Sequence, residues 1–106
     1  MTTSLATTEE ALELIAAHEG ALLLEFGADW CPPCRQIEPA LEAIERDLAP
    51  DLTVRTVDVD RLPELVRRYD VRSAPTMLLF RDGEQRLRMV GARPERALRE
   101  AIAEHL

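Results

Sequence analysis

The chain has 106 residues, of which 46% are hydrophobic and 31% charged, a composition typical of one soluble globular domain. Its 20 acidic and 13 basic residues give a net charge of −7, which argues against a nucleic-acid-binding surface. No apolar stretch approaches the roughly 18 residues of a membrane span, and residues 1–10 lack the basic and apolar regions of a signal peptide. We therefore expect a single cytoplasmic domain over residues 1–106, with no membrane and no nucleic-acid partner.

The N-terminal segment predicts one helix. Thr7 and Glu10 have the spacing of a capping box, which marks a helix start. Residues 1–6, ahead of it, either form a short edge strand or stay irregular. The apolar side chains expected on the inner face of this helix are Leu12, Ile15 and Ala16.

A buried strand, a long helix and a second strand are expected next. The apolar run over residues 21–27 predicts the buried strand, and residues 52–59 predict the second one. Asp60 is expected to cap a short helix after that strand. The long helix between the strands is predicted from apolar residues at spacings of four, three and four, namely Ile37, Leu41, Ile44 and Leu48. The short helix carries Leu62, Leu65, Val66 and Tyr69.

The C-terminal part predicts a β-hairpin and a closing helix. Residues 76–80 form another apolar run, and Asp82-Gly83 is a strong turn signal, so residues 85–90 should return antiparallel. Pro94 can open the last helix at its first position, with Leu98, Ala101 and Ile102 facing inward. This order of elements predicts an α/β fold, with a central mixed β-sheet of four or five strands flanked by helices on both faces.

Cys31 and Cys34 are the only cysteines, and they stand where the buried strand passes into the long helix. A helix start offers unpaired N–H groups and a positive potential, both of which favour a thiolate. We expect Cys31, the more exposed sulfur, to attack a disulfide and Cys34, one turn deeper, to resolve the mixed disulfide. One alternative is an inert structural disulfide, although so short a loop stabilises little. Another is a zinc site, which would need a second chain because His18 and His105 are distant in sequence.

Pro32 and Pro33 separate the two cysteines. Missing N–H groups cost little in a first helical turn, but a residue before proline avoids helical dihedral angles, so Pro32 should be extended and the helix should begin later. The helix field and the N–H of Cys34 are then left to support a Cys31 thiolate. Because no histidine lies between the cysteines, we expect a reducing poise near about −270 mV rather than the roughly −120 mV of strong oxidants.

Glu25 interrupts the apolar strand. Burial raises the pKa of a carboxyl group, and a carboxyl group poised near neutrality can move protons. We therefore expect Glu25 to accept the proton of Cys34, directly or through a water, as that sulfur attacks. The alternative is a strand-end side chain that reaches solvent or pairs with an arginine.

Taken together, these features resemble the thioredoxin family over nearly the whole chain. The matching features, in chain order, are the motif Trp30 to Cys34, Pro39 in the helix, Ala74-Pro75-Thr76, the strand to Phe80, Asp82-Gly83 and Val90-Gly91. The departures are Pro32 for a usual glycine, Glu25 for a buried aspartate, Gly27 for a common aromatic residue and Thr56 for a frequent lysine. These departures leave the expected fold unchanged and affect the chemical properties of the cysteine site.

The resemblance implies a thiol–disulfide oxidoreductase, a protein-disulfide reductase that serves cell redox homeostasis and electron transport through a redox-active disulfide. It implies no bound cofactor, because thioredoxin reductase would return electrons from NADPH. The other partners would be disulfide-containing client proteins, and we expect a monomer. Three alternatives stay open: a pathway-specific thiol oxidoreductase, a protein-binding scaffold whose redox chemistry is secondary, and a metal-bridged dimer.

The resemblance also implies a client-binding surface around the cysteines. The peptide bond before Pro75 would be cis, and the backbone of Ala74 would pair with a client strand. Trp30 would be partly exposed and would supply flat apolar contact, while Gly91 and Ala92 would let a client backbone approach. The full expected substrate-binding set is Trp30, Pro32, Pro33, Ala74, Pro75, Gly91 and Ala92.

Overall fold

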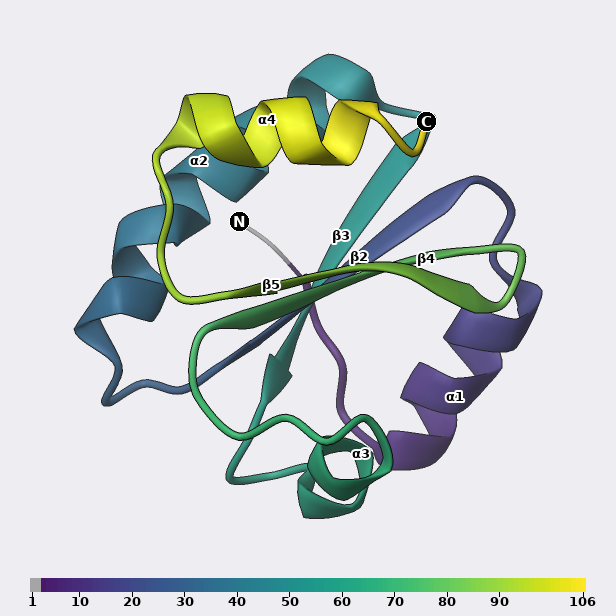
Figure 1. Ribbon diagram of the computed structural model, residues 1–106. Helices are drawn as coiled ribbons and strands as arrows, with labels where there is room; N and C mark the ends of the chain where they lie inside the picture. Colours follow the sequence, from purple (N-terminus) through teal and green to yellow (C-terminus); the bar gives the residue numbers. More distant parts are fainter. Residues whose placement is uncertain (1–2) are drawn as a thin grey trace.

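The computed structural model describes residues 3–106, in which one five-stranded mixed sheet lies between two pairs of helices (Figure 1). The strand order is β1-β3-β2-β4-β5. The parallel part contains β1 (Thr3–Ser4), β3 (Leu52–Asp58) and β2 (Ala21–Gly27). The antiparallel part adds β4 (Thr76–Arg81) and β5 (Glu84–Val90). This topology confirms the predicted fold class. Thr3 and Ser4 form a short edge strand, and the first two residues of that prediction lie outside the described part of the chain.

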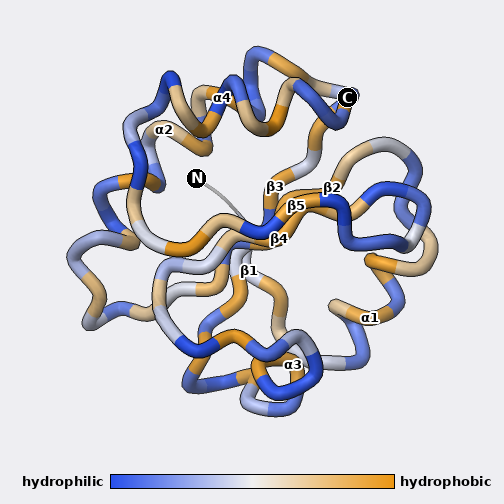
Figure 2. The backbone as a smooth tube through the Cα atoms, viewed as in Figure 1, coloured by the Kyte–Doolittle hydropathy of each residue, from blue (hydrophilic) through white to orange (hydrophobic). Residues whose placement is uncertain are grey.

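Two helices cover each face of the sheet. α2 (Pro32–Leu48) and α4 (Glu95–Ala103) pack on one face, and α1 (Thr8–Ala17) and α3 (Pro63–Arg68) pack on the other (Figure 1). Figure 2 shows hydrophobic residues concentrated along the central strands, whereas the helices alternate between hydrophobic and hydrophilic residues. The buried apolar side chains accordingly form two clusters, one on each face of the sheet.

The central strand β2 determines which side chains reach the cysteine-bearing helix. All seven of its residues are buried, and successive side chains point to opposite faces of the sheet. Those in the α1/α3 cluster are Leu22, Leu24 and Phe26. Those in the α2/α4 cluster are Ala21 and Leu23. The same alternation directs Glu25 and Gly27 toward α2.

The cap of α1 follows the prediction, but its buried face differs in part. The Thr7 side chain accepts the N–H of Glu10 at 3.0 Å, as an N-cap should. Ile15 is buried, but Ala16 is exposed, so that prediction is wrong. Ala11 and Ile15, four residues apart, define the inward stripe, and Ala16 lies one residue further round the helix, outside it.

Three boundary predictions can be compared with the structure. Asp60 does not cap α3, which begins at Pro63 after an uncapped Leu62, so that prediction is wrong. Pro94 precedes α4 as its N-cap instead of opening it, a difference of one residue. The turn prediction is confirmed, because Asp82 and Gly83 both have positive φ, 55° and 80°, as a tight hairpin turn requires.

Candidate active site

A disulfide joins Cys31 and Cys34, whose Cα atoms lie 5.3 Å apart. Cys31 is the N-cap of α2, and its Sγ accepts the N–H of Cys34 at 3.3 Å, which confirms the predicted donor. The prediction for Pro32 is wrong, because α2 begins at Pro32 and the extended residue is Cys31, with φ −106° and ψ 96°. The first helical position suits a proline, whose φ is already helical and whose missing N–H has no partner to lose.

The exposure of the two cysteines differs from the prediction. Cys31 is only 3% exposed, little more than the 1% of Cys34, so the expectation of an exposed attacking sulfur is wrong for the disulfide form. The bridge ties Cys31 Sγ to a buried partner and holds it against the start of α2. The two residues that follow Cys31, Pro32 and Pro33, are exposed. Reduction of the disulfide breaks the covalent bond that holds Cys31 Sγ beside Cys34.

The residues of the expected client surface lie at the same end of the sheet as the cysteines. Thr76, which begins β4, pairs with Phe26 near the end of β2, and this places the preceding Ala74-Pro75 peptide near the strand that leads to Cys31. That peptide is cis, as the resemblance implied. A second cis peptide, Ala49–Pro50, was not foreseen.

Trp30 and Gly91 lie next to the Ala74-Pro75 loop. Trp30 is 66% exposed and lines a pocket of about 250 Å³ together with Ala74. Its indole Nε1 donates to Asp60 Oδ2 at 2.8 Å, which fixes the ring at the surface. Gly91 donates its N–H to the carbonyl oxygen of Pro75 at 2.8 Å, and its φ of 88° is one that favours glycine. Ala92, the next residue, is exposed.

Glu25 is 1% exposed, so it does not reach solvent in the way the alternative required. Its Oε2 atom is buried and has no hydrogen-bond partner among residues 3–106. Burial raises the pKa of Glu25 from 4.5 to about 7, with a further contribution from the nearby carboxylate of Glu38. A carboxyl group with a pKa near neutrality can both accept and release a proton under cellular conditions.

Gly27 provides the space in which the Glu25 carboxylate and Cys34 meet. A Cβ atom at position 27 would lie within 3.0 Å of Glu25 Oε2 and 3.2 Å from Cys34 Sγ. The carboxylate oxygen and the sulfur therefore border the same small space, which a side chain at position 27 would fill. Two departures from the family pattern are thus linked, because the longer acid occupies room that an aromatic residue would take.

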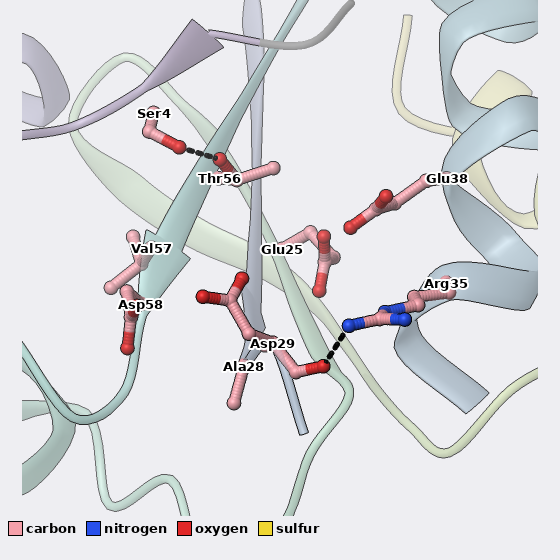
Figure 3. Close-up of a pocket in the computed structure, with 10 residues that line it drawn as sticks. Ser4, Glu25, Ala28, Asp29, Arg35, Glu38, Thr56, Val57 and Asp58 are labelled. Atoms are coloured by element: carbon pink, nitrogen blue, oxygen red, sulfur yellow. Dashed lines mark hydrogen bonds between the residues drawn. The ribbon is translucent and has the colours of Figure 1, made fainter. Parts of the chain in front are cut away.

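Glu25 also faces a pocket of about 200 Å³ between β2, β3 and the first turns of α2 (Figure 3). A pocket of this size has ample room for water. Arg35 and Glu38 project into it from α2, and Arg35 donates to the backbone carbonyl of Asp29. The residues that line it are Ser4, Glu25, Gly27, Ala28, Asp29, Arg35, Glu38, Thr56, Val57 and Asp58.

Sequence reasoning missed Glu38. The signal was available, since Glu38 lies four residues after Cys34 and therefore on the same side of α2.

Over residues 3–106, no group of three or more His, Cys, Asp or Glu side chains could hold a metal ion. No helix in this part of the chain is long and apolar enough to cross a bilayer.

Replacing Gly27 with alanine should force the Glu25 carboxylate to move. We expect Gly27→Ala to destabilise the protein by about 1–3 kcal/mol, because overpacking a buried site has a cost of this size. Glu25→Asp, which withdraws the carboxylate, should relieve most of that loss. Urea denaturation of both single variants and of the double variant measures the coupling, expected at about 1 kcal/mol or more. Additive effects would show that the two positions do not share this space.

A Cys-x-x-Cys disulfide at a helix start, near a cis-proline loop and a buried acid, is the arrangement of the thioredoxin class of folds. The family model described as Thioredoxin matches residues 3–104. The chain belongs to the thioredoxin family, and its Cys31–Cys34 pair has the spacing and helix-start position that dithiol–disulfide exchange requires.

Individual relatives agree with this assignment. The chain is similar to the thioredoxin of Mycobacterium bovis, with 47% identity over 73% of this chain and 66% of the relative. It is also similar to the thioredoxin of Bacillus subtilis, with 40% identity over 83% of this chain and 85% of the relative. The X-ray structure of Fasciola hepatica thioredoxin superposes with a TM-score of 0.89 at 36% identity, covering 99% of this chain and 100% of that chain. The match spans just under two thirds of the mycobacterial protein.

Proposed function

We propose that this protein is a protein-disulfide reductase. The observation that carries the proposal is the position of Cys31 Sγ at the N-cap of α2, where it accepts the N–H of Cys34. In the reduced protein, that N–H and the helix field stabilise a thiolate at Cys31. The thiolate attacks one sulfur of a client disulfide, forms a mixed disulfide and releases the other client sulfur as a thiolate.

Cys34 completes the exchange. Its sulfur attacks Cys31 Sγ, forms the Cys31–Cys34 bond and expels the second client sulfur, so that two electrons pass to the client. Cys34 must lose its proton first, and Glu25 is the nearby base that we propose accepts it. The space beside Gly27, bordered by both Glu25 Oε2 and Cys34 Sγ, supports this role. The pocket of about 200 Å³ that Glu25 lines has room for water, which could take the proton on to solvent.

The proposed client site is the surface around the disulfide. Trp30, held by Asp60, offers apolar contact, and the Ala74 backbone offers pairing groups to an extended client segment. Pro32, Pro33 and Ala92 are exposed. Pro75 and Gly91 join their two loops through the hydrogen bond from the Gly91 N–H to the Pro75 carbonyl oxygen. This set is the one expected from the sequence.

The proposed reaction partners follow from the family. We propose that thioredoxin reductase returns electrons from NADPH to the Cys31–Cys34 disulfide, and that disulfide-containing proteins are the clients. The protein needs no resident cofactor for this exchange, because the two sulfurs carry the electrons. We further propose that residues 1–106 act as one thioredoxin domain and as a monomer. The cytoplasmic location stays a prediction.

Insulin reduction tests this proposal. The protein should accelerate the precipitation of insulin chains first with dithiothreitol and then with NADPH and a bacterial thioredoxin reductase as the electron source. Activity with dithiothreitol but not with the reductase would retain the disulfide chemistry and reject the proposed partner. Absence of activity with both electron sources would reject the reductase function.

A further inference from the structure

The pocket beside Glu25 places a second carboxylate opposite the first. Glu38 projects from α2 toward Glu25, and both side chains line the same 200 Å³ space (Figure 3). Within the described part of the chain, Glu25 Oε2 is buried and has no hydrogen-bond partner. A carboxylate in that position has little to stabilise its negative charge, so nearby charges influence it strongly.

The other charged groups around this pocket come from three segments. α2 contributes Arg35 as well as Glu38, the loop after β2 contributes Asp29, and the end of β3 contributes Asp58. β1 and the middle of β3 supply only hydroxyl groups, and Ser4 and Thr56 bond to each other at 2.7 Å. Arg35, the one cation among the described residues that line the pocket, donates to the Asp29 carbonyl. Burial is the largest influence on Glu25, and Glu38 is the charged neighbour that adds to it.

We propose that Glu38 is a positioning residue whose negative charge favours the protonated form of Glu25 and thereby raises the pH at which Cys34 becomes an effective attacking group. The physical reason is repulsion between two carboxylates that share one small pocket, which favours the neutral form of the more buried one. The kinetic part of this inference rests on the proposed role of Glu25 as proton acceptor. The electrostatic part does not.

The electrostatic part is tested by titrating the Glu25 carboxyl carbon by NMR in the oxidised protein, with Glu25→Gln to assign the resonance. Glu38→Gln keeps the size of the side chain and removes its charge, and it should lower the titration midpoint of Glu25 by about half a pH unit or more. Glu38→Asp, which keeps the charge, should retain most of the midpoint. Glu42→Gln is the matched control, because Glu42 lies one turn further along α2 and lines a different pocket. It should leave the Glu25 midpoint where it is.

The kinetic part is tested by the rate of mixed-disulfide resolution between pH 5 and pH 9. In Glu38→Gln the acid limb of this profile should move to lower pH, so that the rate at pH 6 rises about threefold, the equivalent of half a pH unit. An unchanged Glu25 midpoint in Glu38→Gln would overturn the proposal. A lowered midpoint together with a Glu25→Gln profile identical to that of the parent would instead reject Glu25 as the proton acceptor and leave the electrostatic role of Glu38 intact.

Discussion

Cys31→Ser should lower the protein-dependent rate of insulin reduction by about a thousandfold or more, which leaves the rate of dithiothreitol alone. A serine hydroxyl is not ionised at neutral pH and cannot form the mixed disulfide, so the first step is lost. Turbidity assays of parent and variant at equal concentration measure the effect. If the Cys31→Ser protein kept about a tenth or more of the parent's protein-dependent rate, a group other than Cys31 would be attacking the insulin disulfide.

Cys34→Ser is the matched variant, and it should fail at the other step. Cys31 can still attack, but no second sulfur releases the client, so a one-to-one mixed adduct should accumulate. Non-reducing gel electrophoresis after incubation with a disulfide-bonded protein detects the adduct, and dithiothreitol should remove it. Cys31→Ser under the same conditions should give none. Client binding that survives in Cys31→Ser without any adduct would favour the scaffold alternative.

The second large effect is expected in the stability of the protein as a function of pH. The pKa of Glu25 is raised from 4.5 to about 7 in the folded protein, mainly by burial. The folded state therefore holds a proton that the unfolded state has lost between these two values, so stability should fall as pH rises from about 4.5 through 7 and should then level off. At 1.36 kcal/mol per pH unit, the loss is about 3 kcal/mol.

Glu25→Gln should abolish this loss, because the amide has no charge to bury. The free energies of unfolding of oxidised parent and variant, measured in urea from pH 5 to pH 9, give the test. A buried amide adds an offset that does not depend on pH, so the diagnostic quantity is the change in the difference between the two proteins. Relative to the parent, the free energy of unfolding of the variant should rise by about 2.5 kcal/mol between pH 5 and pH 9. A difference that stays constant over this range would mean that Glu25 is not held in its protonated form by the fold.

The central features of this site were predictable because they depend on local sequence. The two cysteines follow a buried strand and begin an amphipathic helix, and those two elements alone put Cys31 at an N-cap. A single charge in an apolar strand was sufficient to single out Glu25. Strand alternation would also have given its direction, since Glu25 has the parity of Leu23, which packs against α2.

The remainder depends on packing between distant segments. Asp60 had the local sequence of a helix cap, but the fold brings Trp30 to it and its carboxylate bonds the indole instead. The low exposure of Cys31 follows from the bridge to a buried partner, which residue type alone does not reveal. The influence of Glu38 on Glu25 exists only once α2 lies across β2, and the link between Glu25 and Gly27 depends on the same packing.

The most direct test of the central claim is the alkylation of the reduced protein by iodoacetamide at pH 7, followed by mass spectrometry of the cysteine-containing peptide. A Cys31 sulfur supported by the start of α2 and the N–H of Cys34 should react about tenfold or more faster than free cysteine, and well before Cys34. Reaction of Cys31 at or below the rate of free cysteine would contradict the claim that this helix start holds an ionised, reachable nucleophile.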